Sequence, residues 1–157
     1  MLRIATALLD VLERVHGARV IHGRLAPGCV LQDATSGRIG LGDFGGALVQ
    51  SHADAAYRPQ AALDPGLGYA APEQTGRIGR AIDYRSDYYR LGALLYRLLS
   101  GRAPFEEASG ASLLHAVLVQ PPPALPATDA TGAMLAAIVA KLLAKDPELR
   151  YQSAYGL

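Results

Sequence analysis

Cysteine, tryptophan and phenylalanine are scarce in this chain of 157 residues. It contains one cysteine, Cys29, no tryptophan and only two phenylalanines. A single cysteine excludes an intramolecular disulfide framework and is compatible with a reducing compartment. The formal net charge is +1, so the charge balance gives no reason to expect nucleic acid or an anionic membrane surface as a partner.

Long apolar runs are also absent. No stretch approaches the ~20 consecutive apolar residues that are needed to span a bilayer. The apolar beginning of the chain is too short for a signal peptide and is interrupted by Asp10 and Glu13. We therefore expect a cytoplasmic chain, or a cytoplasmic piece of a larger one, with no membrane segment.

The residues that are present suit a single globular domain. Half of them are hydrophobic and 18% are charged, which is ordinary for a folded protein. A chain of this length buries roughly 70% of its extended surface, enough for a real core.

The hydrophobic periodicity predicts a mainly helical domain with one small β-hairpin. Residues 2–16 form an amphipathic pattern that ends at Gly17, and leucines repeat at helical spacing over 91–99 before Gly101. Shorter helical patterns cover 113–118, which precedes three prolines, and 135–143. Residues 30–31 and 39–41 read as the two strands of the hairpin, and 43–70 as a long loop.

Several short motifs follow one another in a fixed order. The first is Val-Ile-His-Gly-Arg-Leu-Ala-Pro-Gly-Cys-Val-Leu at 20–31, and Asp-Phe-Gly follows at 43–45. Gly-Leu-Gly-Tyr-Ala-Ala-Pro-Glu occupies 66–73, and Asp-Tyr-Arg-Ser-Asp-Tyr-Tyr-Arg-Leu-Gly occupies 83–92. Gly-Arg-Ala-Pro-Phe at 101–105 and Arg150 complete the series.

In this order the motifs resemble the C-terminal lobe of a eukaryotic-type Ser/Thr protein kinase. The resemblance covers essentially the whole chain and implies an α+β kinase fold represented by that lobe alone. It implies a partial domain over 1–157, since the N-terminal lobe, with its Gly-rich loop and strand lysine, and the last helices are missing. Residues 74–77 and 143–157 further resemble the kinase-like domains at the front of large bacterial hybrid sensor histidine kinases. Further domains of such a signalling chain, or other proteins, are the partners that this resemblance implies.

The catalytic loop of that family normally reads His-Arg-Asp-Leu-Lys-Pro-x-Asn, and this chain departs from it at four positions. Arg24 stands at the catalytic Asp position, where an arginine cannot accept a proton because it has no acceptor lone pair. Cys29 stands at the second metal ligand, and a soft thiolate suits magnesium poorly. Ala26 and Gly23 replace the lysine and the arginine of the motif. The resemblance therefore implies no intact catalytic residue.

Two matched positions still bear on ATP and magnesium. Asp43 matches the carboxylate that binds magnesium, although it could equally cap the loop after the strand. Leu31 matches the apolar residue that packs beneath adenine. Arg24 could pair with a phosphate group or with Asp43, or be a solvated loop residue, and Cys29 could be a small buried apolar residue. ATP and magnesium thus remain open as cofactors.

Other matched residues belong to the structural frame. His22, Phe44 and Gly45 match members of the apolar spine and its triplet, so His22 is expected in the core. Asp87 matches a buried carboxylate that holds the catalytic-loop backbone. Glu73 and Arg150 match a buried ion pair. The remaining histidines and the modifiable loop residues are expected at the surface: His16, His52, His115, Ser51 and Tyr57.

Three hypotheses about function follow from these residues. The first is a pseudokinase that acts as a regulatory or interaction module. The second is an active Ser/Thr kinase with a displaced catalytic residue, for which Asp33 is the nearest carboxylate. The third is a truncated gene product with no independent function.

Overall fold

The computed structural model describes residues 2–50, 66–106 and 109–157. In this part of the chain the helices are α1 (Leu2–Gly17), α2 (Arg85–Ser100), α3 (Gly110–Val119) and α4 (Ala130–Leu142). The strands are β1 (Val20–Ile21), β2 (Val30–Gln32), β3 (Ile39–Leu41) and β4 (Leu48–Val49). The expectation of a mainly α fold with a small hairpin is confirmed.

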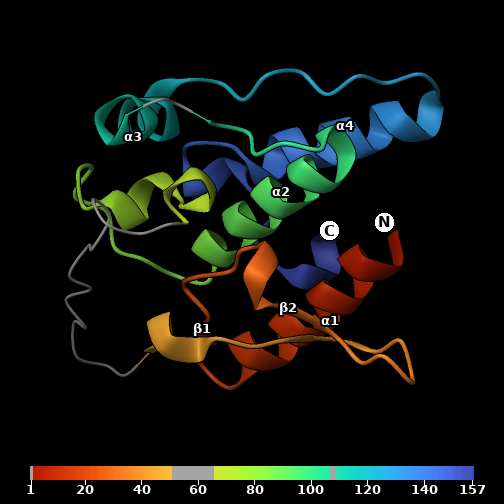
Figure 1. Cartoon of the computed structure of the whole chain (residues 1–157). Coiled ribbons are helices and arrows are strands. Elements are labelled where there is room, and N and C mark those ends of the chain that lie inside the picture. The colour runs from red at the N-terminus through yellow and green to blue at the C-terminus, as the bar shows by residue number, and fades with distance from the viewer. Residues whose placement is uncertain (1, 51–65, 107–108) are drawn as a thin grey trace.

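Helix α2 lies at the centre of the molecule, with α3 and α4 on one side and α1 and the strands on the other (Figure 1). Every residue from Ser86 to Tyr96 is buried, and Gly101 ends the helix at φ 80°. Gly92 allows α4 to pack closely, because a Cβ there would lie 2.6 Å from the Cβ of Leu142. Of the predicted leucine stripe, Leu91, Leu94 and Leu95 are buried, whereas Leu98 and Leu99 in the last turn of α2 are exposed.

Helix α1 covers the other side of the core. Leu8 and Leu12, from the predicted apolar face, are fully buried against α2 and the strands. This packing fixes the direction in which the chain enters β1 and the segment that resembles a catalytic loop.

Two small antiparallel sheets flank that segment. In the predicted hairpin, Leu31 of β2 pairs with Gly40 of β3. In the second sheet, Ile21 of β1 pairs with Leu48 of β4. The strand β4 was expected to be part of the long loop 43–70, because two residues are too short to give a periodic signal.

Part of that loop lies outside the described residues, and Ser51, His52 and Tyr57 are in it. Where the chain is described again, residues 66–75 form two buried 3-10 turns against α2 and α3. Within the described residues, no helix is long and apolar enough to cross a membrane.

Candidate functional site

The backbone that resembles a catalytic loop is held by a buried carboxylate from α2. One oxygen of Asp87 accepts a hydrogen bond from the backbone N–H of His22, and the other accepts one from Gly23, each at 2.8 Å. Asp87 is completely buried, as expected. The position of the loop is therefore set by a charge-assisted contact in the interior.

Two further buried polar residues hold the carbonyl groups of the same loop. Gln74 donates from its amide to the carbonyl of Gly23 at 2.7 Å and accepts from Arg90 Nε at 2.6 Å. Arg90 also donates to the carbonyl of Leu25. Gln74 and Arg90 lie in motifs that the sequence analysis noted, but it assigned no role to either side chain. The available signal was a charged residue within the apolar part of α2, where a cation is rarely buried without partners.

His22 is a core residue, as predicted. Its Nε2 lies 2.9 Å from the carbonyl oxygen of Gly42, and its Nδ1 accepts from the backbone N–H of Arg24. These two contacts fit a neutral imidazole that donates through Nε2. Its ring lies 4.7 Å from that of Phe44, which is itself 45% exposed.

The side chain of Arg24 packs over Gly46. It offers no proton acceptor at the catalytic Asp position. A Cβ at Gly46 would collide with Cγ and Cδ of Arg24, so the arginine stem occupies the space that a side chain there would need. The neighbouring Gly23 has φ 75°, and a Cβ there would lie 2.6 Å from the carbonyl oxygen of Gly46. The loop and the residues after Asp-Phe-Gly thus fit together through paired glycines.

Asp43 is exposed and has left-handed backbone geometry, with φ 55° and ψ 63°. Its Oδ1 would lie 3.2 Å from a Cβ placed on Gly45, so the carboxylate is folded over that glycine. Across the ranges that the structure describes, no three His, Cys, Asp or Glu side chains are grouped so that they could hold a metal ion.

Cys29 is directed into the protein. It is 5% exposed, and its thiol donates to the carbonyl of Arg24 at 3.3 Å. Magnesium prefers several hard oxygen ligands. The donor set of one carboxylate and one internally bonded thiol therefore does not fit the two magnesium ions of the family.

Leu31 is 57% exposed on β2, beside the loop. Its Cδ1 would lie 2.9 Å from a Cβ on Gly42, so Gly42 gives this leucine room. An apolar side chain is therefore presented at the surface where the resemblance places adenine.

Glu73 and Arg150 form the expected buried ion pair. Arg150 donates from both terminal nitrogens, at 2.6 and 2.9 Å, to the two oxygens of Glu73. Ser86 donates a third hydrogen bond to Glu73 at 2.7 Å. Arg150 further donates to the carbonyls of Arg85, Ala144 and Lys145, so every group of this pair is satisfied.

The expectation for His16 was wrong, although His115 is exposed as predicted. The His16 side chain is only 11% exposed, and its Nε2 lies 2.9 Å from an oxygen of Asp87. It packs against the rings of Tyr84 and Tyr88, and burial raises the pKa of Tyr88 to about 12. The missed signal was spacing, because His16 follows the buried Leu12 by four residues on the same face of α1.

Comparison with known proteins adds to this geometry. Residues 1–155 match the protein kinase domain family. The chain is 34% identical over 157 residues to the serine/threonine-protein kinase Pkn1 of Myxococcus xanthus, covering 96% of this chain and 22% of that protein. It is 35% identical over 149 residues to the serine/threonine-protein kinase PknJ of Mycobacterium tuberculosis, covering 91% of this chain and 25% of that one.

A relative of another kind matches a shorter stretch. The chain is 43% identical over 90 residues to the hybrid signal transduction histidine kinase G of Dictyostelium discoideum, covering 57% of this chain and 3% of that protein. The chain therefore spans a quarter or less of the length of these relatives.

Proposed function

Because the chain belongs to the protein kinase domain family, we propose that it is a pseudokinase, a regulatory or interaction module that does not transfer phosphate. We further propose that residues 1–157 correspond to part of the C-terminal lobe, within a larger cytoplasmic signalling protein. Similarity to a short stretch of a hybrid signal transduction histidine kinase supports this setting.

The observation that carries the proposal is the position of Arg24. In the family, catalysis consists mainly of positioning the nucleotide, two metal ions and the hydroxyl nucleophile, with an aspartate in the catalytic loop to accept the hydroxyl proton. Arg24 has no acceptor lone pair, and its stem is packed over Gly46. Loss of a positioned general base typically lowers the rate by about 10²- to 10⁴-fold.

Cys29, at the second metal-ligand position, also supports the proposal of a pseudokinase. Its thiol is buried and hydrogen bonded to the carbonyl of Arg24, so Asp43 is the one metal-binding residue of the motif that the chain retains. We propose that ATP with magnesium binds weakly at most, through Asp43 and Leu31.

The buried contacts that hold the loop and the lobe together are intact, which supports a role as a binding module. Asp87 and Gln74 still hold both N–H and carbonyl groups of the loop, and Glu73 still pairs with Arg150. Buried charges of this kind are costly when one partner is lost. A chain that keeps these structural contacts, while its catalytic-loop residues differ from the family motif, is suited to binding other proteins or domains.

An active kinase with a displaced base is the alternative. Its candidate was Asp33, which lies in the hairpin turn and accepts hydrogen bonds from Ser36 and Thr35. The Ser36 contacts hold the pKa of Asp33 below its usual value. A carboxylate engaged in a surface turn in this way is poorly suited to accept a proton from a substrate.

A phosphoryl-transfer assay tests the proposal. The natural protein that contains this chain is incubated with magnesium and γ-labelled ATP, alone and with a generic protein substrate, beside its Asp43→Ala variant. We expect the same background incorporation from both proteins. Incorporation by the wild type that disappears in Asp43→Ala would overturn the proposal, and Asp10→Ala on the exposed face of α1 serves as the matched control.

A further inference from the structure

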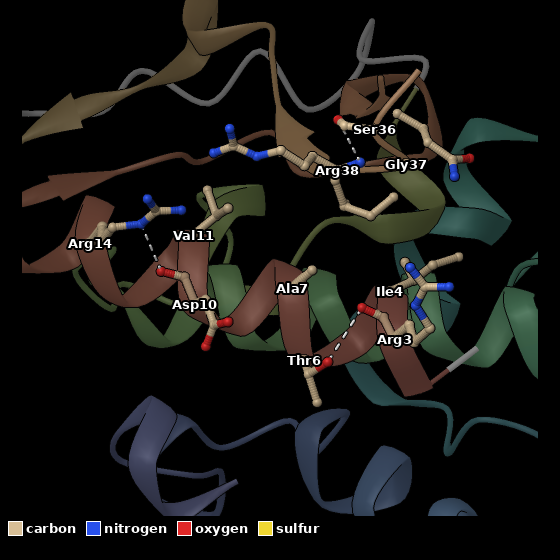
Figure 2. Close-up of a pocket in the computed structure, with 12 residues that line it drawn as sticks. Arg3, Ile4, Thr6, Ala7, Asp10, Val11, Arg14, Ser36, Gly37 and Arg38 are labelled. Atoms are coloured by element: carbon tan, nitrogen blue, oxygen red, sulfur yellow. Dashed lines mark hydrogen bonds between the residues drawn. The ribbon is translucent and has the colours of Figure 1, made fainter. Parts of the chain in front are cut away.

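A polar groove runs between α1 and the turn of the β2–β3 hairpin, with a volume of about 580 Å³ (Figure 2). Its walls come from α1 on one side and from residues 32 and 36–39 on the other. None of the residues that the resemblance assigns to the catalytic or metal site lines it.

The groove concentrates positive charge in a nearly neutral chain. Arg3, Arg14 and Arg38 line it, together with one carboxylate, Asp10. In Figure 2 the side chain of Arg38 extends toward the end of the groove where Arg14 lies, and the carboxylate of Asp10 points to the other side of α1.

These arginines have no acidic partner among the described residues. Arg14 donates only from Nε, to the backbone carbonyl of Asp10 at 3.2 Å, which leaves the terminal nitrogens of its guanidinium available. By contrast, Arg80, Arg85 and Arg150 are all in ion pairs elsewhere in the structure. The groove thus presents unneutralised guanidinium groups, which bind carboxylates in a two-pronged geometry.

Apolar side chains also line the groove, beside the polar Thr6, Gln32 and Ser36. Ile4 and Val11 from α1 and Ile39 from β3 contribute to it. Arg3 and Arg14 are about 16 Å apart along the helix, given a rise of ~1.5 Å per residue. About five residues of an extended peptide cover that length, at ~3.3 Å per residue.

We propose that this groove binds an extended acidic segment of a partner protein. Carboxylates of that segment pair with Arg14 and Arg38, and its interleaved apolar side chains contact Ile4 and Val11. Charge complementarity favours an acidic peptide. A nucleic acid is disfavoured, because no aromatic side chain lines the groove for base stacking. The inference does not depend on the pseudokinase proposal, since a catalytically active chain would bind through the same groove.

Fluorescence anisotropy with a defined probe tests the inference. The full chain is titrated against a labelled peptide of three Glu-Leu-Glu-Ser repeats, beside a peptide with lysine in place of each glutamate. We expect saturable binding of the acidic peptide alone, weakened at higher salt because exposed charges are screened. The double variant R14Q/R38Q is expected to bind about tenfold more weakly or worse.

A charge-matched variant provides the control. R77Q/R102Q removes two exposed arginines that lie outside the groove, and it is expected to bind as the wild type does. Circular dichroism and thermal unfolding of both double variants show whether they fold. Equal binding by the two double variants, or no binding of the acidic peptide, would overturn the inference. So would binding of anionic phospholipid vesicles or an oligothymidylate that depends on Arg14 and Arg38 while the peptide does not bind.

Discussion

Glu73 and Arg150 are joined by two hydrogen bonds of 2.6 and 2.9 Å, although 77 residues separate them in the chain. Both side chains are buried, and Ser86 adds a third contact to the carboxylate. The pair ties the turn at the end of the Ala-Pro-Glu motif to the segment after α4. It therefore couples the part of the chain that supports the loop to the C-terminal part of the fold.

Breaking this pair is expected to destabilise the fold strongly. Glu73→Gln leaves the Arg150 guanidinium buried without its counter-charge, which typically costs about 3–5 kcal/mol. Glu148→Gln removes a surface ion pair with Arg85 and is expected to cost less than about 1 kcal/mol. Urea unfolding followed by circular dichroism measures both. Equal losses in the two variants would contradict the prediction.

The polar cluster around Asp87 leads to a second prediction. Asp87 accepts from two backbone N–H groups and lies 2.9 Å from His16 Nε2. In Asp87→Asn one of these contacts faces an NH₂ group, and the buried donors lose a charged acceptor. We expect a loss of ~2–4 kcal/mol in the free energy of unfolding.

The control for this variant is the same substitution on the surface. Asp10→Asn on the exposed face of α1 is expected to change the free energy of unfolding by less than about 0.5 kcal/mol. If Asp87→Asn were no more costly than Asp10→Asn, the carboxylate would not be what holds the loop.

The helices and the residues of the structural frame could be predicted from the sequence, because helices follow from local periodicity and the frame residues belong to long motifs. The apolar repeats predicted α1, α3 and the end of α2 near Gly101. The Ala-Pro-Glu triplet and the distant arginine predicted the Glu73–Arg150 pair. What the sequence did not reveal depends on three-dimensional neighbours.

His16 illustrates that limit. Its position on α1 fits either a surface histidine or the continuation of the face of Leu12, and only the packing of Tyr84 and Tyr88 decides between them. Arg90 is similar, because a buried arginine is tolerated only where Gln74 and backbone carbonyls receive its hydrogen bonds. Such partners come from segments far away in the sequence.

Lys145 gives a prediction for the dependence of stability on pH. Its Nζ donates to the carbonyls of Ala116 and Val117 at the end of α3 and lies 4.2 Å from the centre of the Phe105 ring. Burial, with a smaller contribution from the nearby Arg150, lowers the pKa of Lys145 to about 8 from 10.5. Between these two pH values the unfolded chain binds more protons than the folded chain, so stability from this group rises with pH.

The comparison with Lys145→Met isolates that effect. The free energy of unfolding of the wild type should increase relative to the variant as pH rises from 8 to about 10.5, and should not change below pH 7. Lys141→Met, at an exposed position of α4, is the control and should show no such trend. A constant difference between wild type and Lys145→Met over this range would mean that the contacts with α3 keep the ammonium charged.

The contact between Arg24 and Gly46 is testable with a double-mutant cycle. A Cβ at Gly46 would collide with the stem of Arg24, so Gly46→Ala forces the arginine to move and is expected to cost about 1 kcal/mol. In an Arg24→Ala background the same substitution should be nearly neutral, which gives a coupling energy of about 0.5–1.5 kcal/mol. Gly28→Ala is the control, since nothing lies within 4 Å of a Cβ there. Urea unfolding of the four proteins of the cycle measures the coupling, and equal costs of Gly46→Ala in both backgrounds would show that Arg24 does not lie across this glycine in solution.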